Sequence, residues 1–400
     1  MKILFATDNF YPNINGAANF TLELAKGLIG NGHIVTVIAP AQKFANTVTK
    51  YKGIIIYGIR SVMIPPVIHP ARTRIPFVDS LNIEKIIKKV SPQIIHIQDH
   101  FFIGSQVVDT GKREDIPIIG TNLFLPENLI HYLHPPAFVR QPLSKLAWKQ
   151  FISIFNKLDL VTTPTVTAVK LIKKLGLKTP VIAISCGVNL TRFTPKKKGN
   201  SKATVLYVGR LDKEKNIDVI IKAFAKVLDS VDAKLIITGQ GKEKENLEEL
   251  TRQLGVDKNT TFTGLIPEEN LPSLYQSASV FVIASTAELQ SIVTLEAMAS
   301  GLPVVAADAV ALPELVHHGQ NGYLFKAEDV KQLAEYIVEI LKDPVLQKKM
   351  SQNSLKIVRP HKSENTVKNY EKIYANLIAA KTLISPVRKY PFFYRVQSRR

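Results

Sequence analysis

Hydrophobic residues gather along the chain in short runs, and longer amphipathic stretches separate these runs. The runs have the length of buried strands and lie at 2–7, 33–40, 54–59, 94–98, 203–209, 233–239, 260–264, 279–285 and 303–308. Between them, apolar residues recur at helical spacing in the stretches 17–32, 216–229, 243–255 and 267–278. Strands that alternate with helices predict parallel sheets covered by helices on both faces, which is the α/β class.

The alternation of strands and helices occurs in two series. A polar, basic stretch at 185–202 separates them and is typical of a linker. We therefore expect two doubly wound, Rossmann-like domains that face each other across a cleft, which is the natural ligand site of such a pair. The expected divisions are a first domain at 1–185, a linker at 186–202, a second domain at 203–365, and a C-terminal helix and basic tail at 366–400 that returns to the first domain.

The composition adds a strong positive charge to this picture. The 400 residues carry a formal net charge of +19, and the segment 381–400 contains basic residues but no acidic one. Such a surplus attracts phosphates and anionic lipid headgroups, although a basic surface also serves solubility alone. No motif that reads nucleic acid accompanies the charge, so no specific nucleic-acid partner is expected.

Cysteine content and hydropathy bear on the compartment. Cys186 is the single cysteine, so no internal disulfide can form, which is typical of a reducing compartment. The first apolar run ends at Asp8 and predicts a buried strand rather than a signal peptide. No apolar run reaches the roughly 18 residues that span a bilayer. We expect a cytoplasmic protein that can attach peripherally to the inner face of the cell membrane.

Three strand ends in the second half carry residues suited to a ligand. Gly209 ends one strand and is followed by Arg210 and Lys215, two cations that suit a diphosphate. Gly239 follows the next strand and allows a close backbone approach. The turn "TGLIP" follows the third strand and could line a flat base pocket through the backbone of Leu265 and Ile266. Taken alone, Arg210 and Lys215 are also consistent with a solvated charge cluster.

The segment "STAELQSIVTLEAMASGLPVVA" predicts a helix that begins near Glu288 or Leu289 and ends at Gly301. The first amides of a helix have no intrahelical acceptor, and together with the helix dipole they form an anion site. These amides are expected around Leu289, Gln290 and Ser291.

Two glutamates of this segment need an explanation. Glu296 falls on the same stripe as the apolar Ile292, and a buried carboxylate is costly unless it is hydrogen-bonded. The two vicinal hydroxyls of a ribose would satisfy it. Glu288, at the mouth of the helix, could bind the hydroxyls of a sugar beyond the phosphates. The alternative is that Glu296 pairs with a lysine and that Glu288 is only a helix-entry carboxylate.

The first half offers weaker signals. The turn around Gly16, after the first strand, can bring backbone amides to a ligand, but no G-x-G-x-x-G fingerprint is present. His96, Asp99 and His100 follow a strand, where they serve either a function or a structural role.

Taken together, these stretches resemble glycosyltransferase family 4, whose members are retaining enzymes of the GT-B fold. Glu288 and Glu296 are separated by seven residues and match the family's E-x7-E motif. The resemblance covers most of the chain through the fragments "DNFYPNINGAANF", "NGHIVTVIAP", "IIHIQDH", "GTN", "TTPT", "ISCGVNLTRFTP", "YVGRLDKEKNIDVIIKAF", "ITGQGKE", "FTGLIP", "LEAMASGLPVVAAD" and "PELVHHGQNGYLF".

The resemblance implies an acceptor-binding first domain and a nucleotide-sugar-binding second domain. It implies front-face attack, in which Arg210 and Lys215 stabilise the leaving diphosphate, Glu288 faces the transferred sugar and Glu296 binds the ribose. Catalytic roles are expected for Glu288, Arg210, Lys215 and His100. Donor contacts are expected from Gly16, Gly209, Arg210, Lys215, Gly239, Leu265, Ile266, Glu288, Leu289, Gln290, Ser291, Ile292 and Glu296. No metal site and no cofactor are expected.

One departure from the family pattern concerns the residue after "GTN". Relatives commonly carry a histidine there, whereas this chain has Leu123, which cannot transfer a proton. Either His100 or another group takes its place, or the activity is reduced, or the chain only binds a sugar nucleotide. A sugar-nucleotide epimerase shares the architecture, but the E-x7-E match argues against it.

The acceptor is suggested by basic segments with aromatic residues. The stretch 138–158 is amphipathic, carries several lysines and contains Trp148, the single tryptophan. Such a helix suits a membrane interface, although it could equally be an ordinary core-facing helix. The tail "RKYPFFYRVQSRR" has a similar composition. We expect a hexose to pass from a UDP- or GDP-linked donor to a membrane lipid such as diacylglycerol or phosphatidylinositol, with a soluble or polysaccharide acceptor as the alternative.

Overall fold

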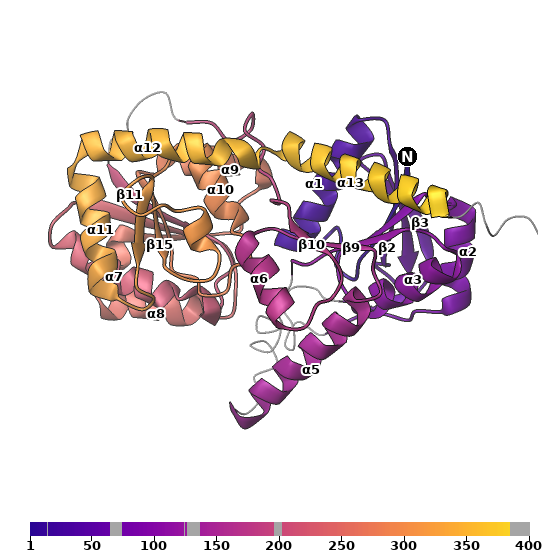
Figure 1. Ribbon diagram of the computed structural model, residues 1–400. Helices are drawn as coiled ribbons and strands as arrows, with labels where there is room; N and C mark the ends of the chain where they lie inside the picture. Colours follow the sequence, from indigo (N-terminus) through magenta and orange to yellow (C-terminus); the bar gives the residue numbers. More distant parts are fainter. Residues whose placement is uncertain (14, 65–73, 124, 126–136, 196–201, 385–400) are drawn as a thin grey trace, which may run out of the picture.

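The computed structural model describes residues 1–13, 15–64, 74–123, 125, 137–195 and 202–384. Two α/β domains lie side by side, each built on a largely parallel sheet, and this confirms the expected GT-B class (Figure 1). The basic tail from residue 385 and part of the linker, 196–201, lie outside the described residues.

Within the described residues, the first sheet has eight strands, and all neighbours are parallel except the edge strand β3 and its neighbour β4. The order across the sheet is β10 (Val181–Ala183), β9 (Leu160–Thr163), β8 (Ile118–Thr121), β7 (Ile94–Ile97), β1 (Lys2–Ala6), β2 (Ile34–Pro40), β4 (Ile54–Ile59) and β3 (Thr47–Tyr51). A small antiparallel pair, β5 (Ser61–Met63) and β6 (Arg74–Pro76), lies outside it. The helices are α1 (Gly16–Gly30), α2 (Ser80–Val90), α3 (Phe102–Arg113), α5 (Ala137–Phe155) and α6 (Val166–Lys174).

The second sheet has six parallel strands. Its order is β13 (Thr260–Gly264), β12 (Ala233–Thr238), β11 (Ala203–Val208), β14 (Val280–Ile283), β15 (Val304–Ala307) and β16 (Gly322–Phe325). Its α-helices are α7 (Ile217–Leu228), α8 (Lys244–Gln253), α9 (Leu271–Ser277), α10 (Ile292–Ala299), α11 (Val330–Lys342) and α12 (Pro344–Val358). Short 3-10 turns are η1 (Lys213–Lys215), η2 (Asp257–Asn259), η3 (Glu268–Asn270), η4 (Leu312–Glu314) and η5 (Arg359–His361).

The strands form where the apolar runs predicted them. In β1 every residue after Lys2 is buried, as expected for a central parallel strand covered on both faces. The strand order reverses between β1 and β7 in the first sheet and between β11 and β14 in the second. Crevices for ligands open at such switch points, beyond the carboxyl ends of the strands. The loops after β11 and β14 are therefore where the second domain should hold a ligand.

The last helix, α13 (Ser363–Ile384), leaves the second domain and packs on the first, against α1 and β7 (Figure 1). A buried polar network holds it there. The two ring nitrogens of His96 lie 2.6 Å from the hydroxyl of Tyr374 on α13 and 2.6 Å from Oγ1 of Thr121. The Tyr370 hydroxyl lies 3.0 Å from the same Thr121 atom. Burial lowers the pKa of His96 to about 3, so this histidine is neutral and structural.

Candidate active site

Glycines let the loops after β11 and β12 approach each other closely. The amide of Gly209 donates to the carbonyl oxygen of Thr238 over 3.0 Å. Gly239 has a φ of +136°, and a Cβ atom there would lie 1.8 Å from the carbonyl oxygen of Gly209, so no other residue fits. Leu265 and Ile266 follow β13, the next strand in the sheet, and Leu265 is exposed. These loops thus share one edge of the sheet.

The two predicted cations lie in a cluster with carboxylates. Arg210 contacts Asp212, and its Nη2 lies 2.8 Å from Oε1 of Glu214. Lys215 is buried, and its Nζ lies 2.6 Å from Oε1 of Glu288, which comes from the loop after β14. The structure therefore brings Lys215 and Glu288 together at the switch point. The acidic partners Asp212 and Glu214 were not predicted, although "RLDKEK" shows acids and bases alternating.

A second set of bonds joins the same two loops. The side-chain amide of Asn216 donates to the carbonyl oxygen of Ala284 over 3.1 Å. The amide of Thr286 donates to the carbonyl oxygen of Glu214 over 3.4 Å. The cation cluster and the loop that carries Glu288 are therefore held as one unit.

The helix of the E-x7-E segment starts later than predicted. α10 begins at Ile292, and Ser291 caps it by accepting the amide of Thr294 over 3.2 Å. The expectation of a helix start near Glu288 or Leu289 is wrong, because the Ser291 hydroxyl occupies the cap position. Glu288 lies in a loop before the helix, and Glu296 lies little more than one turn inside it. The uncapped first amides belong to Ile292 and Val293 rather than to residues 289–291.

Among the residues that the structure describes, the side-chain partner of Glu296 is a tyrosine rather than a lysine. The hydroxyl of Tyr275, a fully buried residue of α9, donates to Oε2 of Glu296 over 2.8 Å. Desolvation raises the pKa of Glu296 to about 7, and the Tyr275 hydrogen bond partly opposes that rise. The side chain is only half-buried, so it remains accessible to a ligand. No sequence signal identified Tyr275 as this partner.

The first domain contributes the start of α1 to the same region. Asn15 caps α1 by accepting the amide of Ala18 over 2.9 Å. Gly16 is exposed, and a Cβ atom there would lie 3.8 Å from Cδ1 of Ile292. The first turns of α1 and α10 therefore lie close together, and both carry the positive end of a helix dipole.

His100 is buried against aromatic rings. Its ring centroid lies 4.2 Å from that of Phe101 and 5.4 Å from that of Phe151 on α5. Burial lowers the pKa of His100 to about 4, so it is neutral near pH 7. Its catalytic role remains a prediction. Leu123 is half-buried and packs against the apolar core of the first domain.

Asp99 forms a buried pair with Asp8 rather than an open site. Oδ2 of Asp99 accepts the Thr7 hydroxyl over 2.9 Å and the Asp8 amide over 2.7 Å. Burial and the neighbouring carboxylate raise the pKa of Asp8 well above its usual value. The Asp8 carboxylate in turn accepts the amide of Ile103 at the start of α3, so the two carboxyls tie the loop after β1 to the loop after β7.

Leu289 and Gln290 lie at the junction of the two domains. Leu289 is buried in an apolar cluster whose other fully buried members belong to the first domain. Gln290 accepts the amide of Cys186 through Oε1 over 2.7 Å. In this structure both side chains contact the first domain. Whether they also contact a donor remains a prediction.

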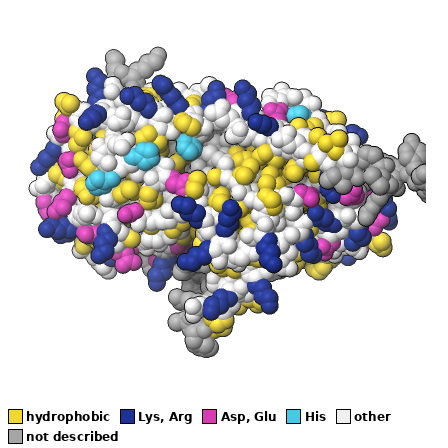
Figure 2. Space-filling model, in the orientation of Figure 1, with side chains coloured by type: hydrophobic (Ala, Val, Ile, Leu, Met, Phe, Trp, Pro, Cys, Tyr) yellow, Lys and Arg dark blue, Asp and Glu magenta, His cyan; other side chains and the backbone are white. Residues whose placement is uncertain are grey.

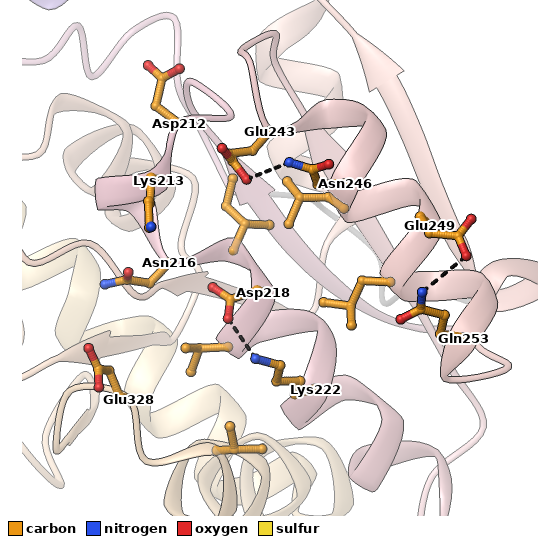
Figure 3. A pocket seen from close by; sticks show the side chains of 15 residues that line it. Asp212, Lys213, Asn216, Asp218, Lys222, Glu243, Asn246, Glu249, Gln253 and Glu328 are labelled. Atoms are coloured by element: carbon orange, nitrogen blue, oxygen red, sulfur yellow. Dashed lines mark hydrogen bonds and ion pairs between the residues drawn. The ribbon is translucent and has the colours of Figure 1, made fainter. Parts of the chain in front are cut away.

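A cavity of about 770 Å³ lies beside the site, between η1, α7 and α8 (Figure 3). Two lysines lie among its lining residues. Five carboxylates line it as well, namely Asp212, Asp218, Glu243, Glu249 and Glu328. An excess of carboxylates repels a diphosphate, so this cavity does not suit the phosphates of a donor. In the described part of the chain, no group of three or more His, Cys, Asp or Glu side chains is placed to hold a metal ion.

Comparison with known families accounts for this architecture. The model of Glycosyltransferase Family 4 matches residues 14–192, and that of Glycosyl transferases group 1 matches residues 188–357. The chain belongs to glycosyltransferase family 4. It is a hexosyltransferase with the GT-B fold, and the retaining character implied by the resemblance is consistent with this family.

Two curated relatives and one solved structure illustrate the similarity. Alpha-monoglucosyldiacylglycerol synthase of Streptococcus pneumoniae is 29% identical over 85% of this chain and 78% of its own length. A GDP-mannose-dependent alpha-mannosyltransferase of Corynebacterium glutamicum is 26% identical over 85% of this chain and 81% of its own. HepE of Anabaena, solved with UDP-glucose, has a TM-score of 0.74 and 18% identity, covering 94% of this chain and all of HepE.

The amphipathic stretch forms α5, which has two different halves. In its second half Trp148, Phe151 and Phe155 are buried in the first domain, so this half is core-facing and Trp148 is not an interfacial anchor in this structure. Its first half projects from the body of the protein, and Leu146 is 63% exposed there beside the exposed Lys145 (Figure 1). Within the described ranges, no helix is both long and apolar enough to cross a bilayer.

Proposed function

We propose that the protein transfers a hexose from a UDP- or GDP-linked donor to a membrane lipid such as diacylglycerol or phosphatidylinositol, retaining the anomeric configuration. The Lys215–Glu288 ion pair carries this proposal, because it joins a buried cation to a carboxylate at the switch point of the second sheet. A diphosphate would lie near Arg210 and Lys215, and the sugar would lie near Glu288.

The proposed chemistry follows from these charges. The bond between the anomeric carbon and the diphosphate oxygen breaks, and Lys215 and Arg210 stabilise the negative charge that develops on the leaving group. The acceptor hydroxyl attacks from the same face, and its proton passes to the leaving phosphate. This route assigns no proton transfer to Leu123, and we propose that it requires no metal cofactor.

Three observations support the donor site. Glu296 has no lysine partner among the described contacts, and its hydrogen bond from Tyr275 uses one carboxylate oxygen, Oε2. The half-buried side chain can therefore accept the two hydroxyls of a ribose. The start of α10 presents uncapped amides near Gly16 of the first domain. HepE, which has the same fold, was solved with a sugar nucleotide.

A lipid acceptor is supported by the name of the streptococcal relative and by one surface of the first domain. On α6 and the adjoining β10, Leu175 and Ile182 are exposed, and Lys170, Lys173 and Lys174 are exposed on the same helix. Figure 2 shows Lys and Arg side chains beside an apolar area on this side of the molecule and on the projecting part below it. Exposed apolar residues beside exposed lysines suit an anionic membrane surface, and we propose attachment to the cytoplasmic face of the membrane.

The proposed activity is tested by incubating the protein with UDP- and GDP-linked hexoses and with diacylglycerol or phosphatidylinositol in vesicles. Mass spectrometry is expected to show one hexose added to a lipid, with nucleoside diphosphate released in equal amount. The rate is expected to be unchanged by EDTA. Nucleotide binding without any product would instead indicate the non-catalytic alternative, and transfer to a soluble sugar would contradict the lipid acceptor.

The membrane contact predicts a specific charge dependence. Replacing both Lys145 and Lys149 of α5 by glutamate should weaken binding to vesicles rich in anionic lipid about tenfold or more, because each basic residue near such a surface contributes about 1 kcal/mol. Co-sedimentation at low and high salt measures the effect. The matched control replaces the exposed Lys226 and Lys331 of the second domain by glutamate. An equal loss in both double variants would show that only the total charge matters.

A further inference from the structure

The start of α6 is held by a carboxylate from the other domain. α6 lies where the two domains meet (Figure 1). Oε2 of Glu314, from η4 of the second domain, accepts the amide of Val166 over 3.1 Å, and Oε1 accepts the amide of Thr167 over 2.5 Å. These are two of the first-turn amides that a helix cannot satisfy internally. A carboxylate at this end also complements the helix dipole.

The residue before α6 makes a second bond across the junction. The hydroxyl of Thr165 accepts the amide of Ala168 over 3.2 Å and donates to the carbonyl oxygen of Leu289 over 2.8 Å. Thr165 is buried, and the Leu289 side chain is buried in the apolar cluster of the first domain. The same helix start is therefore bonded both to η4 and to the loop before α10.

Gln290 makes the third connection. Its Oε1 accepts the amide of Cys186 over 2.7 Å and the hydroxyl of Ser185 over 3.2 Å, just after the last strand of the first sheet. The Ser185 hydroxyl also lies 2.9 Å from Nδ1 of His361, next to the start of α13. Gln290 thus ties the loop before α10 to the segment where the chain passes between the domains.

We propose that Gln290 and Glu314 are positioning residues that hold the Glu288 loop in place through contacts with the first domain. Glu288 immediately precedes Leu289 and Gln290, so the docking of those two residues fixes where its carboxylate lies. The donor site is then complete only while the domains are docked through the start of α6. That this arrangement matters for catalysis rests on the proposed function. The coupling between domain docking and the position of the Glu288 loop rests only on the contacts at the junction.

The coupling has a measurable consequence for ligand binding. If the Glu288 loop is in position only in the docked state, the apparent dissociation constant of a donor rises by the inverse of the docked fraction. Removing Glu314 leaves two helix amides without their acceptor and lowers that fraction. Removing the Gln290 side chain frees the loop from the segment at Ser185 and Cys186. This also lowers the fraction of molecules in which the loop is in position, so the apparent dissociation constant rises.

The test compares Glu314→Ala and Gln290→Ala with controls that lose equivalent bonds inside one domain. Asp343→Ala removes a carboxylate that caps α12 by accepting the amides of Val345 and Leu346, both over 2.9 Å. Gln347→Ala removes a glutamine bonded to the carbonyl oxygen of Ser279 over 3.0 Å. Hydrogen exchange by mass spectrometry is followed in the full chain, and UDP, GDP, UDP-glucose and GDP-mannose are titrated by calorimetry.

In Glu314→Ala, exchange is expected to accelerate about tenfold in two distant peptides, 164–170 and 285–292. In Gln290→Ala the same acceleration is expected at 285–292. The affinity for the nucleotide that the unmodified chain binds is expected to fall three- to tenfold in both variants, while the controls change only their local peptides. If Glu314→Ala accelerates 164–170 alone and affinity is unchanged, the coupling is absent.

The two proposals fail in different ways. If the unmodified chain binds none of the four nucleotides, the proposed donor site fails, but the exchange of 285–292 in Glu314→Ala still supports or overturns the coupling. The conservative Glu314→Gln keeps an acceptor oxygen without the charge, so its exchange at 285–292 should lie between those of the unmodified chain and Glu314→Ala. An acceleration confined to the capped helix start, as expected for Asp343→Ala at α12, would reduce Glu314 to an ordinary helix cap.

Discussion

Replacing Lys215 by methionine is expected to lower kcat/KM for hexose transfer about a thousandfold, as loss of a group that stabilises developing charge generally does. The ammonium group is buried and lies 2.6 Å from Glu288, in a region that excludes much of the solvent. There a positive charge is worth more to a leaving diphosphate than it would be in water. Lys215→Arg keeps the charge and should retain part of the activity.

The ion pair makes this prediction sharper. Lys215→Met leaves the Glu288 carboxylate without its partner, which could disturb the site for a reason unrelated to the diphosphate. The double variant Lys215→Met/Glu288→Gln removes both charges. If Lys215 only neutralises Glu288, this double variant recovers nucleotide-diphosphate binding; if Lys215 holds the diphosphate, binding stays weak.

Steady-state kinetics and calorimetry measure these changes. The matched control is Lys222→Met, because Lys222 is an exposed lysine of α7 paired with Asp218 over 2.8 Å. Its loss should leave kcat/KM within about twofold of the unmodified protein, as is usual for exposed ion pairs. Unchanged kinetics in Lys215→Met would remove this lysine from the proposed mechanism.

The second large effect is expected at Glu296. Its replacement by alanine should raise the dissociation constant of a nucleotide sugar about ten- to a hundredfold, because hydrogen bonds to a charged group contribute about 1.5–3 kcal/mol. A donor that contains deoxyribose should bind the unmodified protein more weakly. It should lose little further affinity in Glu296→Ala, since part of the interaction is already missing.

Glu296 also predicts how donor affinity depends on pH. Its pKa is raised to about 7 by burial, and the ionised form is the better acceptor for two ribose hydroxyls. Affinity should therefore rise as pH increases from about 6 to about 8 and then level off, with a slope of up to about tenfold per pH unit below the pKa. A nucleotide sugar is the right probe, because a terminal phosphate itself titrates near pH 6.

Two variants isolate the contribution of this carboxylate. Glu296→Gln should bind weakly at every pH and should lose the rise between about pH 6 and 8. Tyr275→Phe removes the hydrogen bond that lowers the pKa of Glu296, so the midpoint of the rise should move to higher pH. A rise that persists unchanged in Glu296→Gln would assign the titration to another group.

Much of the fold follows from local sequence patterns. A buried parallel strand needs a short apolar run and its covering helix needs apolar residues at helical spacing, and both are readable without knowing which strands pair. The predicted runs became β1, β2, β4 and β7 in the first sheet and β11 to β15 in the second. The carboxyl ends of these strands then indicated where Arg210, Lys215 and Glu288 would lie.

Contacts between residues distant in the sequence were harder to predict. Lys215 was expected at a diphosphate, yet here it pairs with Glu288, and Glu296 pairs with Tyr275. The sequence shows that such residues are chemically able to pair, but each has several candidate partners of equal chemistry. The choice among them depends on how loops from different strands converge.

The sequence by itself determined the α/β alternation, the family and the loops that carry the candidate chemistry, because these depend on residues close together in the chain. Tertiary structure alone decided that Tyr275 donates to Glu296, that Trp148 is buried and that Glu314 caps a helix of the other domain. The physical reason is that each such side chain has several chemically equivalent partners. A hydroxyl, an aromatic ring or a carboxylate contacts the partner that the packed domains place within reach. The distance between two groups far apart in the chain is not encoded in any local pattern.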